Sequence, residues 1–568
     1  MKKIKPILEV LFVVYIVYTR CINLSWGLPY PMHPDERNMV DALMGLKLDS
    51  LLKPNFYAYG QSPLYLGYGL LSLYYFFSYK ITAISFFDGT IVLRMISAAA
   101  SIVTVFILIK IIGFFFKKGL LPEKNDMIAY PLYLVLGISP FAIQLSHFGT
   151  TESILMLLYA SIVFLSLEHL SETSPSWRLT VVAGIVCGIA AAVKMSSVLF
   201  IFVPLFAFLY HFLHTSKKSP PKQWIRHAII FLFVAVIIAV LFSPYNYIAF
   251  GEFYHSMKYE SDVALGNALV FYTRQFVGAI PVVFQLTSIF PYALGWPIFI
   301  FSLCGFFLHF RKKEMNLLRL AFLVYFIPQS FLFAKWTRFV ASVFPLLLIF
   351  AYLFLYSVFS KVLKAAKKNR RMQPIAFAVF SLVVFFSILP GIAYFSIYQR
   401  KDVRFQASEW IHSHIPSESL ILSETANVVD IPLKFFGYHL ISFDFYNVDK
   451  DFFLQNNLQN YLKEADYIFV PSRRIFMNHT CTELQNLELR IQNIDSERCR
   501  HLEEAYPLLN EYYKRLFSGE LGFEQVAEFS SYPSFSLFGK KIVEFPDEGA
   551  EETWSVFDHP VIRIYKRI

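Results

Sequence analysis

Long apolar stretches follow one another through the first 400 residues of the chain, with short polar segments between them. A stretch of about 20 mostly apolar residues is long enough to cross a bilayer as a helix. The pattern therefore predicts a polytopic α-helical membrane protein with about 11 transmembrane helices. The predicted spans are residues 7–24, 91–116, 127–145, 152–168, 179–195, 196–213, 227–249, 286–310, 316–334, 339–359 and 374–398.

The apolar stretch 62–80 is predicted to lie on the membrane as an interfacial helix instead of crossing it. It contains five tyrosines, and tyrosine favours the membrane–water interface. If this stretch does not cross the membrane and the N-terminus lies in the cytoplasm, the main basic clusters fall on the cytoplasmic side, as the positive-inside rule requires. These clusters lie at residues 117–124, 217–226, 311–313 and 361–371. The same arrangement places loop 25–90 and everything after residue 400 on the outer side.

After residue 400 the pattern changes to short alternating segments that suggest a small α/β domain. The amphipathic segment is 407–414, and the strand-like segments are 420–423, 467–470 and 561–565. The charge changes at the same point, because residues 401–568 hold 17 Lys and Arg against 26 Asp and Glu, whereas the preceding residues hold 34 against 15. We therefore expect a membrane domain over residues 1–400 and a soluble extracytoplasmic α/β domain over residues 401–568.

Composition excludes a fully soluble protein, since only 16% of the residues are charged and 56% are hydrophobic. The net charge of +10 is concentrated in short clusters between apolar runs, where such clusters orient a membrane protein. We therefore expect membrane lipids as partners and no nucleic acid. The sequence also contains no phosphate-binding Gly-x-x-x-x-Gly-Lys loop, no His-Glu-x-x-His motif and no Gly-x-Ser-x-Gly motif.

Acidic residues on the predicted outer face are the first candidates for chemistry. Asp35 and Glu36 follow the first span, and Glu152 begins a later one. Carboxylates in these places can serve as a general base or hold a divalent metal. The ordinary alternatives are a solvated loop acid for the first pair and, for Glu152, an acid stabilised by the helix dipole. Because both sites lie on one face, we take Asp35, Glu36 and Glu152 as catalytic candidates, and Asp35 with Glu152 as candidate metal ligands.

Four basic residues near or within spans are candidates for binding a phosphate. Lys194 lies in an apolar stretch, Lys335 and Arg338 lie outside against the positive-inside trend, and Arg94 lies near the outer end of a span. Charged residues within membranes often mark functional sites. The alternatives are a lysine that reaches the membrane surface and basic residues that contact lipid head groups.

Two cysteines fall in the predicted outer domain, Cys481 and Cys499. Disulfides persist in compartments outside the cytoplasm. We therefore predict a Cys481–Cys499 disulfide.

The ordered motifs resemble those of polyprenyl-phosphate-dependent glycosyltransferases of the GT-C superfamily, the relatives of protein O-mannosyltransferases and lipid A aminoarabinose transferases. They are His33-Pro34-Asp35-Glu36, Ser62-Pro63-Leu64-Tyr65, Arg94-Met95-Ile96-Ser97, the acid Glu152, Gly188 to Lys194, and Lys335-Trp336-Thr337-Arg338-Phe339. The ending Phe557-Asp558-His559-Pro560 resembles the tail of such enzymes that carry an outer domain.

The resemblance implies a GT-C fold, with Asp35 as the catalytic acid of the first loop and Glu152 as that of the second. The aminoarabinose transferases carry Glu-Lys-Pro-Pro where this chain has Gly60-Gln61-Ser62-Pro63, so the phosphate-binding lysine of that branch is missing. Donor phosphate binding is therefore expected at Lys194, Lys335 and Arg338.

The implied activity is an inverting transfer of a sugar from a polyprenyl-phosphate donor to a hydroxyl of a protein, lipid or glycan on the outer face. No cofactor is required, although a divalent metal near Asp35 and Glu152 is compatible with the residue types. The expected location is a prokaryotic plasma membrane, with an endoplasmic-reticulum membrane as the alternative. Other functional hypotheses are a transporter or flippase and a non-catalytic receptor, but the sequence shows no paired repeat halves of the transporter kind.

Overall fold

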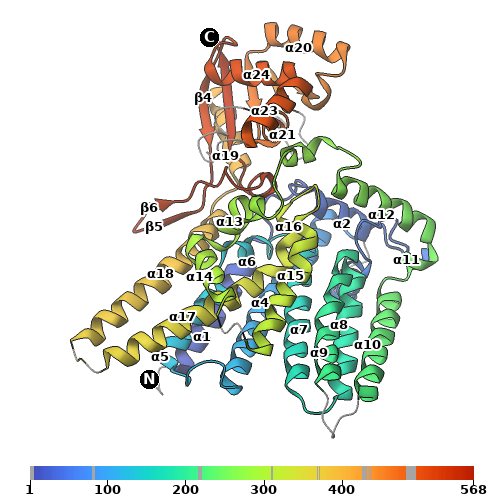
Figure 1. Cartoon of the computed structure of the whole chain (residues 1–568). Coiled ribbons are helices and arrows are strands. Elements are labelled where there is room, and N and C mark those ends of the chain that lie inside the picture. The colour runs from blue at the N-terminus through green and yellow to red at the C-terminus, as the bar shows by residue number, and fades with distance from the viewer. Residues whose placement is uncertain are drawn as a thin grey trace.

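A computed structural model describes residues 5–79, 83–214, 221–308, 311–367, 369, 371–424, 431–433, 437–481 and 494–568. The residues before 400 form a helical membrane domain, and the residues after 400 form a C-terminal domain mounted on one of its faces (Figure 1). We name this face of the membrane domain the domain face. The N-terminal end of α1 (Lys5–Cys21) lies at the opposite face (Figure 1).

The membrane domain has at least one helix at each predicted span, and further helices between them. After α1 they are α2 (Pro34–Met44), α3 (Ser62–Phe77), α4 (Phe86–Lys117), α5 (Asp126–Gly137), α6 (Pro140–Gln144), α7 (Glu152–Ser171), α8 (Trp177–Val193), η2 (Met195–Ile201), α9 (Phe202–Leu213), α10 (Pro221–Phe242), α11 (Tyr245–Ile248), α12 (Phe250–Leu265), α13 (Phe290–Leu294), α14 (Trp296–Phe306), α15 (Lys313–Ser330), α16 (Thr337–Val340), α17 (Phe344–Ala366) and α18 (Met372–Gln399).

Six helices of the described chain are long and apolar enough to cross a membrane, and a seventh span results if one bent pair is counted. The six are α4, α7, η2 with α9, α10, α16 with α17, and α18, and the bent pair is Gln285–Leu294 with Trp296–Phe306. The other four predicted spans fall on α1, α5, α8 and α15, which are shorter or carry more charge. The count of 11 therefore stays a prediction, while the multi-pass helical membrane fold is confirmed.

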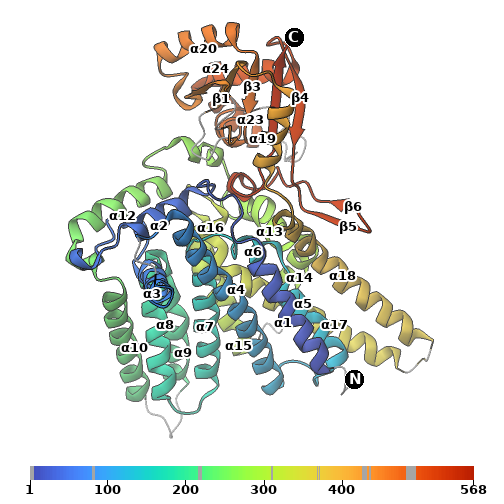
Figure 2. The ribbon, with the colours of Figure 1, turned by 180° about the vertical axis from the view of Figure 1, so that it is seen from behind.

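Helix α3 lies across the direction of the spans. Figure 2 shows it nearly end-on, whereas α4, α7, α8 and α10 run along the page. Its apolar residues Phe76 and Phe77 are largely exposed, as expected of side chains that face lipid. This orientation agrees with the predicted interfacial helix.

The C-terminal domain contains a five-stranded mixed sheet in the order β2-β1-β3-β7-β4. Strands β1 and β2, and β1 and β3, pair in parallel, while β7 runs antiparallel to its neighbours β3 and β4. The strands are β1 (Leu420–Glu424), β2 (His439–Phe443), β3 (Tyr467–Val470), β4 (Phe523–Phe529) and β7 (Ile562–Arg567), and a separate hairpin is formed by β5 (Ser534–Leu537) and β6 (Lys540–Glu544). The helices around the sheet are α19 (Val403–His414), α20 (Phe452–Glu464), α21 (Arg474–His479), α23 (Ile494–Ala505) and α24 (Pro507–Ser518).

Apolar side chains from both faces of this sheet are buried under the helices, so the domain has its own core. A disulfide joins Cys481, directly after α21, to Cys499 on α23. This disulfide was predicted from the sequence, because the C-terminal domain is expected to lie outside the cytoplasm.

Candidate active site

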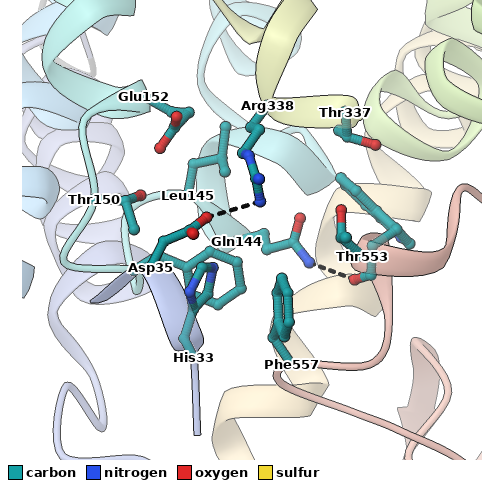
Figure 3. A pocket seen from close by; sticks show the side chains of 12 residues that line it. His33, Asp35, Gln144, Leu145, Thr150, Glu152, Thr337, Arg338, Thr553 and Phe557 are labelled. Atoms are coloured by element: carbon teal, nitrogen blue, oxygen red, sulfur yellow. Dashed lines mark hydrogen bonds and ion pairs between the residues drawn. The ribbon is translucent and has the colours of Figure 1, made fainter. Parts of the chain in front are cut away.

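A small pocket lies where the domain face of the membrane helices meets the C-terminal domain (Figure 3). About 360 Å³ of space there is not filled by atoms, part of it open to solvent. Its lining residues come from both domains and are His33, Asp35, Gln144, Leu145, Phe148, Thr150, Glu152, Thr337, Arg338, Thr553, Trp554 and Phe557.

Asp35 and Arg338 face each other across this pocket (Figure 3). Asp35 lies in the first turn of α2, which Pro34 starts and His33 caps by accepting a hydrogen bond from the Glu36 backbone N–H. Arg338 lies on α16, at the beginning of a long span. The Arg338 Nη1 atom is 2.7 Å from Asp35 Oδ2. The predicted first-loop acid and one predicted phosphate ligand are thus brought together.

The surroundings keep Asp35 ionised. Burial raises the pKa of its carboxyl, but the positive charge of Arg338 and, at longer range, of Lys194 outweighs burial, so the pKa lies below its ordinary value. Although Arg338 is close, Asp35 Oδ2 accepts no hydrogen bond of good geometry from any group in the described part of the chain. An ionised, unprotonated carboxylate is what a general base requires.

Glu152 and Lys194 form a second ion pair beside the first. The Lys194 Nζ atom is 3.3 Å from Glu152 Oε1. Glu152 is the first residue of α7, and Lys194 has an extended backbone where α8 ends and η2 begins. The ring of Tyr59 lies 5.1 Å from the Lys194 ammonium. The structure therefore places both predicted residues next to the pocket, which Glu152 lines.

The segment before α3 crosses the end of α8 at Gly60, which brings Tyr59 to Lys194. The Gly60 N–H donates to the Val193 carbonyl at 3.0 Å. A Cβ atom at this position would come within 2.0 Å of the Ala192 carbonyl oxygen. Only glycine allows this approach of the two backbones.

Glu36 and Arg94 are paired with each other and do not line the pocket. Arg94 donates two hydrogen bonds to the Glu36 carboxylate, at 2.9 and 2.6 Å, and both side chains are buried. The Gly149 N–H also donates to Glu36, at 2.7 Å, and Arg94 donates to the carbonyls of Leu24 and Trp26. This network ties the first loop to α4 and to the segment before α7. Glu36 and Arg94, predicted as a catalytic acid and a phosphate ligand, therefore lie outside the pocket that Asp35 and Arg338 line.

Lys335 is likewise directed away from the pocket. Its ammonium donates to the carbonyls of Leu332 and Phe333 at 2.9 and 3.1 Å. Burial lowers the pKa of Lys335 to about 8. Of the four predicted phosphate ligands, Arg338 lines the pocket and Lys194 adjoins it.

The described residues contain no group of three or more His, Cys, Asp or Glu side chains that could hold a metal ion. Asp35 and Glu152, the candidate ligands, are each already paired with a cation. A metal at this place would have to displace Arg338 or Lys194.

One wall of the pocket comes from the C-terminal domain and was not predicted from the sequence; it consists of Thr553, Trp554 and Phe557. The Phe557 ring lies 4.2 Å from the ring of His33, which is two residues before Asp35 in the chain. Gln144 of α6 donates a hydrogen bond to the Trp554 carbonyl at 2.6 Å (Figure 3). The only signal in the sequence was the resemblance of the ending at Phe557.

A buried charged network fastens this wall to the membrane domain. Asp558 accepts hydrogen bonds from the hydroxyls of Tyr394 and Tyr398 on α18, at 3.0 and 2.7 Å. His559 lies between Asp558 and Asp547, at 2.6 and 2.8 Å. Burial lowers the pKa of His559, but the two carboxylates outweigh burial and raise it to about 10. His559 is therefore a cation at neutral pH.

Comparison with known families gives a match that covers part of the chain. Residues 73–248 match the family model described as dolichyl-phosphate-mannose-protein mannosyltransferase. No curated protein matches the chain by sequence.

Among solved structures, the chain is similar to ArnT from Cupriavidus metallidurans bound to undecaprenyl phosphate, at 12% identity and a TM-score of 0.48, over 81% of this chain and 92% of that one. It is also similar to AglB from Archaeoglobus fulgidus in complex with an inhibitory peptide and a dolichol-phosphate, at 12% identity and a TM-score of 0.49, over 84% and 72%. A third is the Archaeoglobus fulgidus oligosaccharyltransferase tethered with an acceptor peptide, at 11% identity and a TM-score of 0.47, over 100% and 89%. Over residues 73–248 the chain is thus similar to this mannosyltransferase family, and its ordered motifs resemble those of the GT-C superfamily.

Proposed function

We propose that the chain transfers a sugar from a polyprenyl-phosphate donor to a hydroxyl acceptor at the domain face. The observation that carries this proposal is the Asp35–Arg338 pair, an ionised carboxylate and a guanidinium 2.7 Å apart in one pocket. A carboxylate supplies the base that a hydroxyl nucleophile needs, and a guanidinium suits a phosphate leaving group.

In the proposed step, the acceptor oxygen attacks the anomeric carbon while its proton passes to Asp35. The bond between the anomeric carbon and the phosphate oxygen breaks, and the lipid phosphate leaves with the bonding electrons. Arg338, with Lys194 nearby, stabilises the charge that develops on this phosphate. Because attack and departure take place on opposite sides of the carbon, the transfer inverts the anomeric configuration.

The ion pair also suggests how the donor prepares the base. In the donor-free pocket, Arg338 lowers the pKa of Asp35. A donor phosphate that binds Arg338 shares its positive charge, so the pKa of Asp35 rises and the carboxylate becomes a stronger base. Binding of the donor thereby precedes full activation of the acceptor hydroxyl.

The pocket needs no metal in this proposal, since Arg338 and Lys194 already supply positive charge beside Asp35 and Glu152. We propose that the N-terminus lies in the cytoplasm and the domain face outside, in a plasma membrane. The distribution of basic loops along the sequence supports this orientation.

The test is to incubate the purified chain in detergent with a panel of polyprenyl-phosphate sugars and to measure release of the lipid phosphate. We expect release from at least one donor, with a product of inverted anomeric configuration. A folded protein that binds these donors but releases no lipid phosphate, with hydroxyl acceptors present, would contradict the proposal.

A further inference from the structure

The β5–β6 hairpin projects from the C-terminal domain beside the end of α18 (Figures 1 and 2). It forms a two-stranded sheet of its own and does not join the five-stranded sheet. Phe538 and Gly539 connect its strands with positive φ angles of 50° and 77°, as in the tight turns that suit hairpins. An isolated two-stranded hairpin is marginally stable in water. We therefore expect contact with another surface to stabilise the hairpin.

The tip of this hairpin is apolar and exposed. Phe538 is 96% exposed, Ile542 61% and Leu537 49%. A cluster of large apolar side chains at the end of a projecting hairpin is costly in water and typical of an interaction surface. Two lysines, Lys540 and Lys541, follow the turn directly and are also exposed.

The base of the hairpin is fixed to the membrane domain. The Ser534 N–H donates to the Ser396 hydroxyl of α18 at 3.1 Å, and Arg400 donates to the Ser534 hydroxyl. The Phe535 ring lies 6.4 Å from the ring of Phe385 on α18. Phe385 and its neighbour Phe386 are exposed on a helix that is apolar enough to cross the membrane. The hairpin thus continues the lipid-facing side of α18.

We propose that the hairpin tip inserts into the lipid leaflet at the domain face. Phe538, Leu537 and Ile542 would lie among the outermost acyl chains, where apolar side chains such as Phe and Leu are buried at the boundary with the head groups. Lys540 and Lys541 would lie at the level of the lipid phosphates, which attract basic side chains. The hairpin then holds the C-terminal domain to the membrane at a second point, apart from the network around His559. This inference does not depend on the proposed reaction.

The test places an environment-sensitive fluorophore, NBD, at the tip. The starting protein has Cys21, Cys187 and Cys304 replaced, which leaves the Cys481–Cys499 disulfide intact. Phe538→Cys is then labelled and reconstituted in phosphatidylcholine–phosphatidylglycerol nanodiscs. The matched control is Phe452→Cys, which also replaces a highly exposed phenylalanine, at 75%. Phe452 begins α20, and this helix lies on the side of the C-terminal domain away from the membrane helices (Figure 1).

We expect the label at position 538 to emit at shorter wavelength in nanodiscs and to be quenched by lipids that carry a nitroxide near the head group. The label at position 452 should emit as in water and remain unquenched. Equal, water-like emission without quenching at both positions would overturn the proposal. A blue shift that appears in detergent and grows with protein concentration would also overturn it, because the tip would then be covered by a second copy of the chain.

Discussion

Glu551 of the C-terminal domain accepts two hydrogen bonds from Thr337, the residue before Arg338, at 3.1 Å from the backbone N–H and 3.0 Å from the hydroxyl. Thr337 is the first residue of α16, so the carboxylate satisfies an N–H group at the start of the helix that carries Arg338. Gln275 donates to the other Glu551 oxygen at 3.3 Å. Through this contact the C-terminal domain positions the guanidinium opposite Asp35.

We predict that Glu551→Ala impairs transfer through the position of Arg338. Loss of a capping acceptor typically costs about 0.5–2 kcal/mol, so donor affinity should fall about 2–30-fold, with a smaller change in turnover. Glu551→Gln keeps an acceptor oxygen and should recover part of the loss. The measurement is the donor KM and kcat of the three proteins. Equal KM values for wild type and Glu551→Ala would show that Thr337 needs no partner from the C-terminal domain.

Asp35→Asn should nearly abolish transfer, since removal of a general base typically costs about 10²–10⁴-fold in rate. Donor binding and expression should be retained, because the amide has nearly the shape of the carboxylate. Asp41→Asn is the matched control, as it makes the same change at an exposed position of the same helix, α2. If Asp35→Asn keeps more than about a tenth of the wild-type turnover, another group takes the proton.

Arg338→Ala should weaken donor binding about 10–100-fold, because a hydrogen bond to a charged group contributes about 1.5–3 kcal/mol. The donor affinity of Arg338→Lys should lie between those of wild type and Arg338→Ala, since lysine keeps the charge but not the planar fork of donors. Lys335→Met should have the smaller effect on donor affinity, because its ammonium is bonded to the carbonyls of its own loop. A larger loss of donor affinity for Lys335→Met than for Arg338→Ala would show that the donor phosphate binds outside this pocket. Titration of each variant with a polyprenyl-phosphate sugar measures these affinities.

The stability of the folded chain should decrease in alkaline solution because of His559. Its pKa is raised to about 10 in the folded state, above the ordinary value of 6.5. The stabilisation by the proton is therefore complete below about pH 6.5 and is lost as the pH rises towards 10. The melting temperature in detergent should fall over this range, and the fall should be smaller in His559→Gln. If the melting temperature falls equally with pH in wild type and His559→Gln, groups other than His559 cause the loss of stability in alkaline solution.

Transfer should continue in the presence of EDTA, because Asp35 and Glu152 are each neutralised by a basic residue. The measurement is the rate of lipid-phosphate release before and after chelation. A rate that is lost on chelation and restored by Mg²⁺ or Mn²⁺ would show that a metal displaces one of these cations during the reaction.

Periodicity and composition were sufficient for the helical membrane fold and for β3, whose bounds match the predicted segment 467–470. They could not distinguish Asp35 from Glu36 by environment, although successive residues of a helix point in different directions. One carboxylate of α2 therefore faces the pocket, while the next is buried against Arg94. The resemblance to a family, rather than the local pattern, indicated Asp35.

The contacts between distant parts of the chain were beyond the sequence pattern. Nothing near Arg338 or Asp35 in the sequence indicates that their side chains meet, because the contact depends on how the helices pack. The same holds for Glu551 and Phe557, which reach the membrane domain from the other end of the chain. Single-sequence patterns report local structure, and this site is assembled from four separate segments.

The pocket is lined by residues from near both ends of the chain, so it cannot form until the last of them has been synthesised. Ribosomes add about 5–20 residues per second, so Phe557 emerges on the order of 0.5–2 minutes after Asp35. Throughout that interval Asp35, the proposed base, is present, but the wall that faces it has not yet been made. A newly synthesised chain can thus insert its membrane helices before it has a complete pocket, because the sheet of the C-terminal domain also needs β7, which follows Phe557.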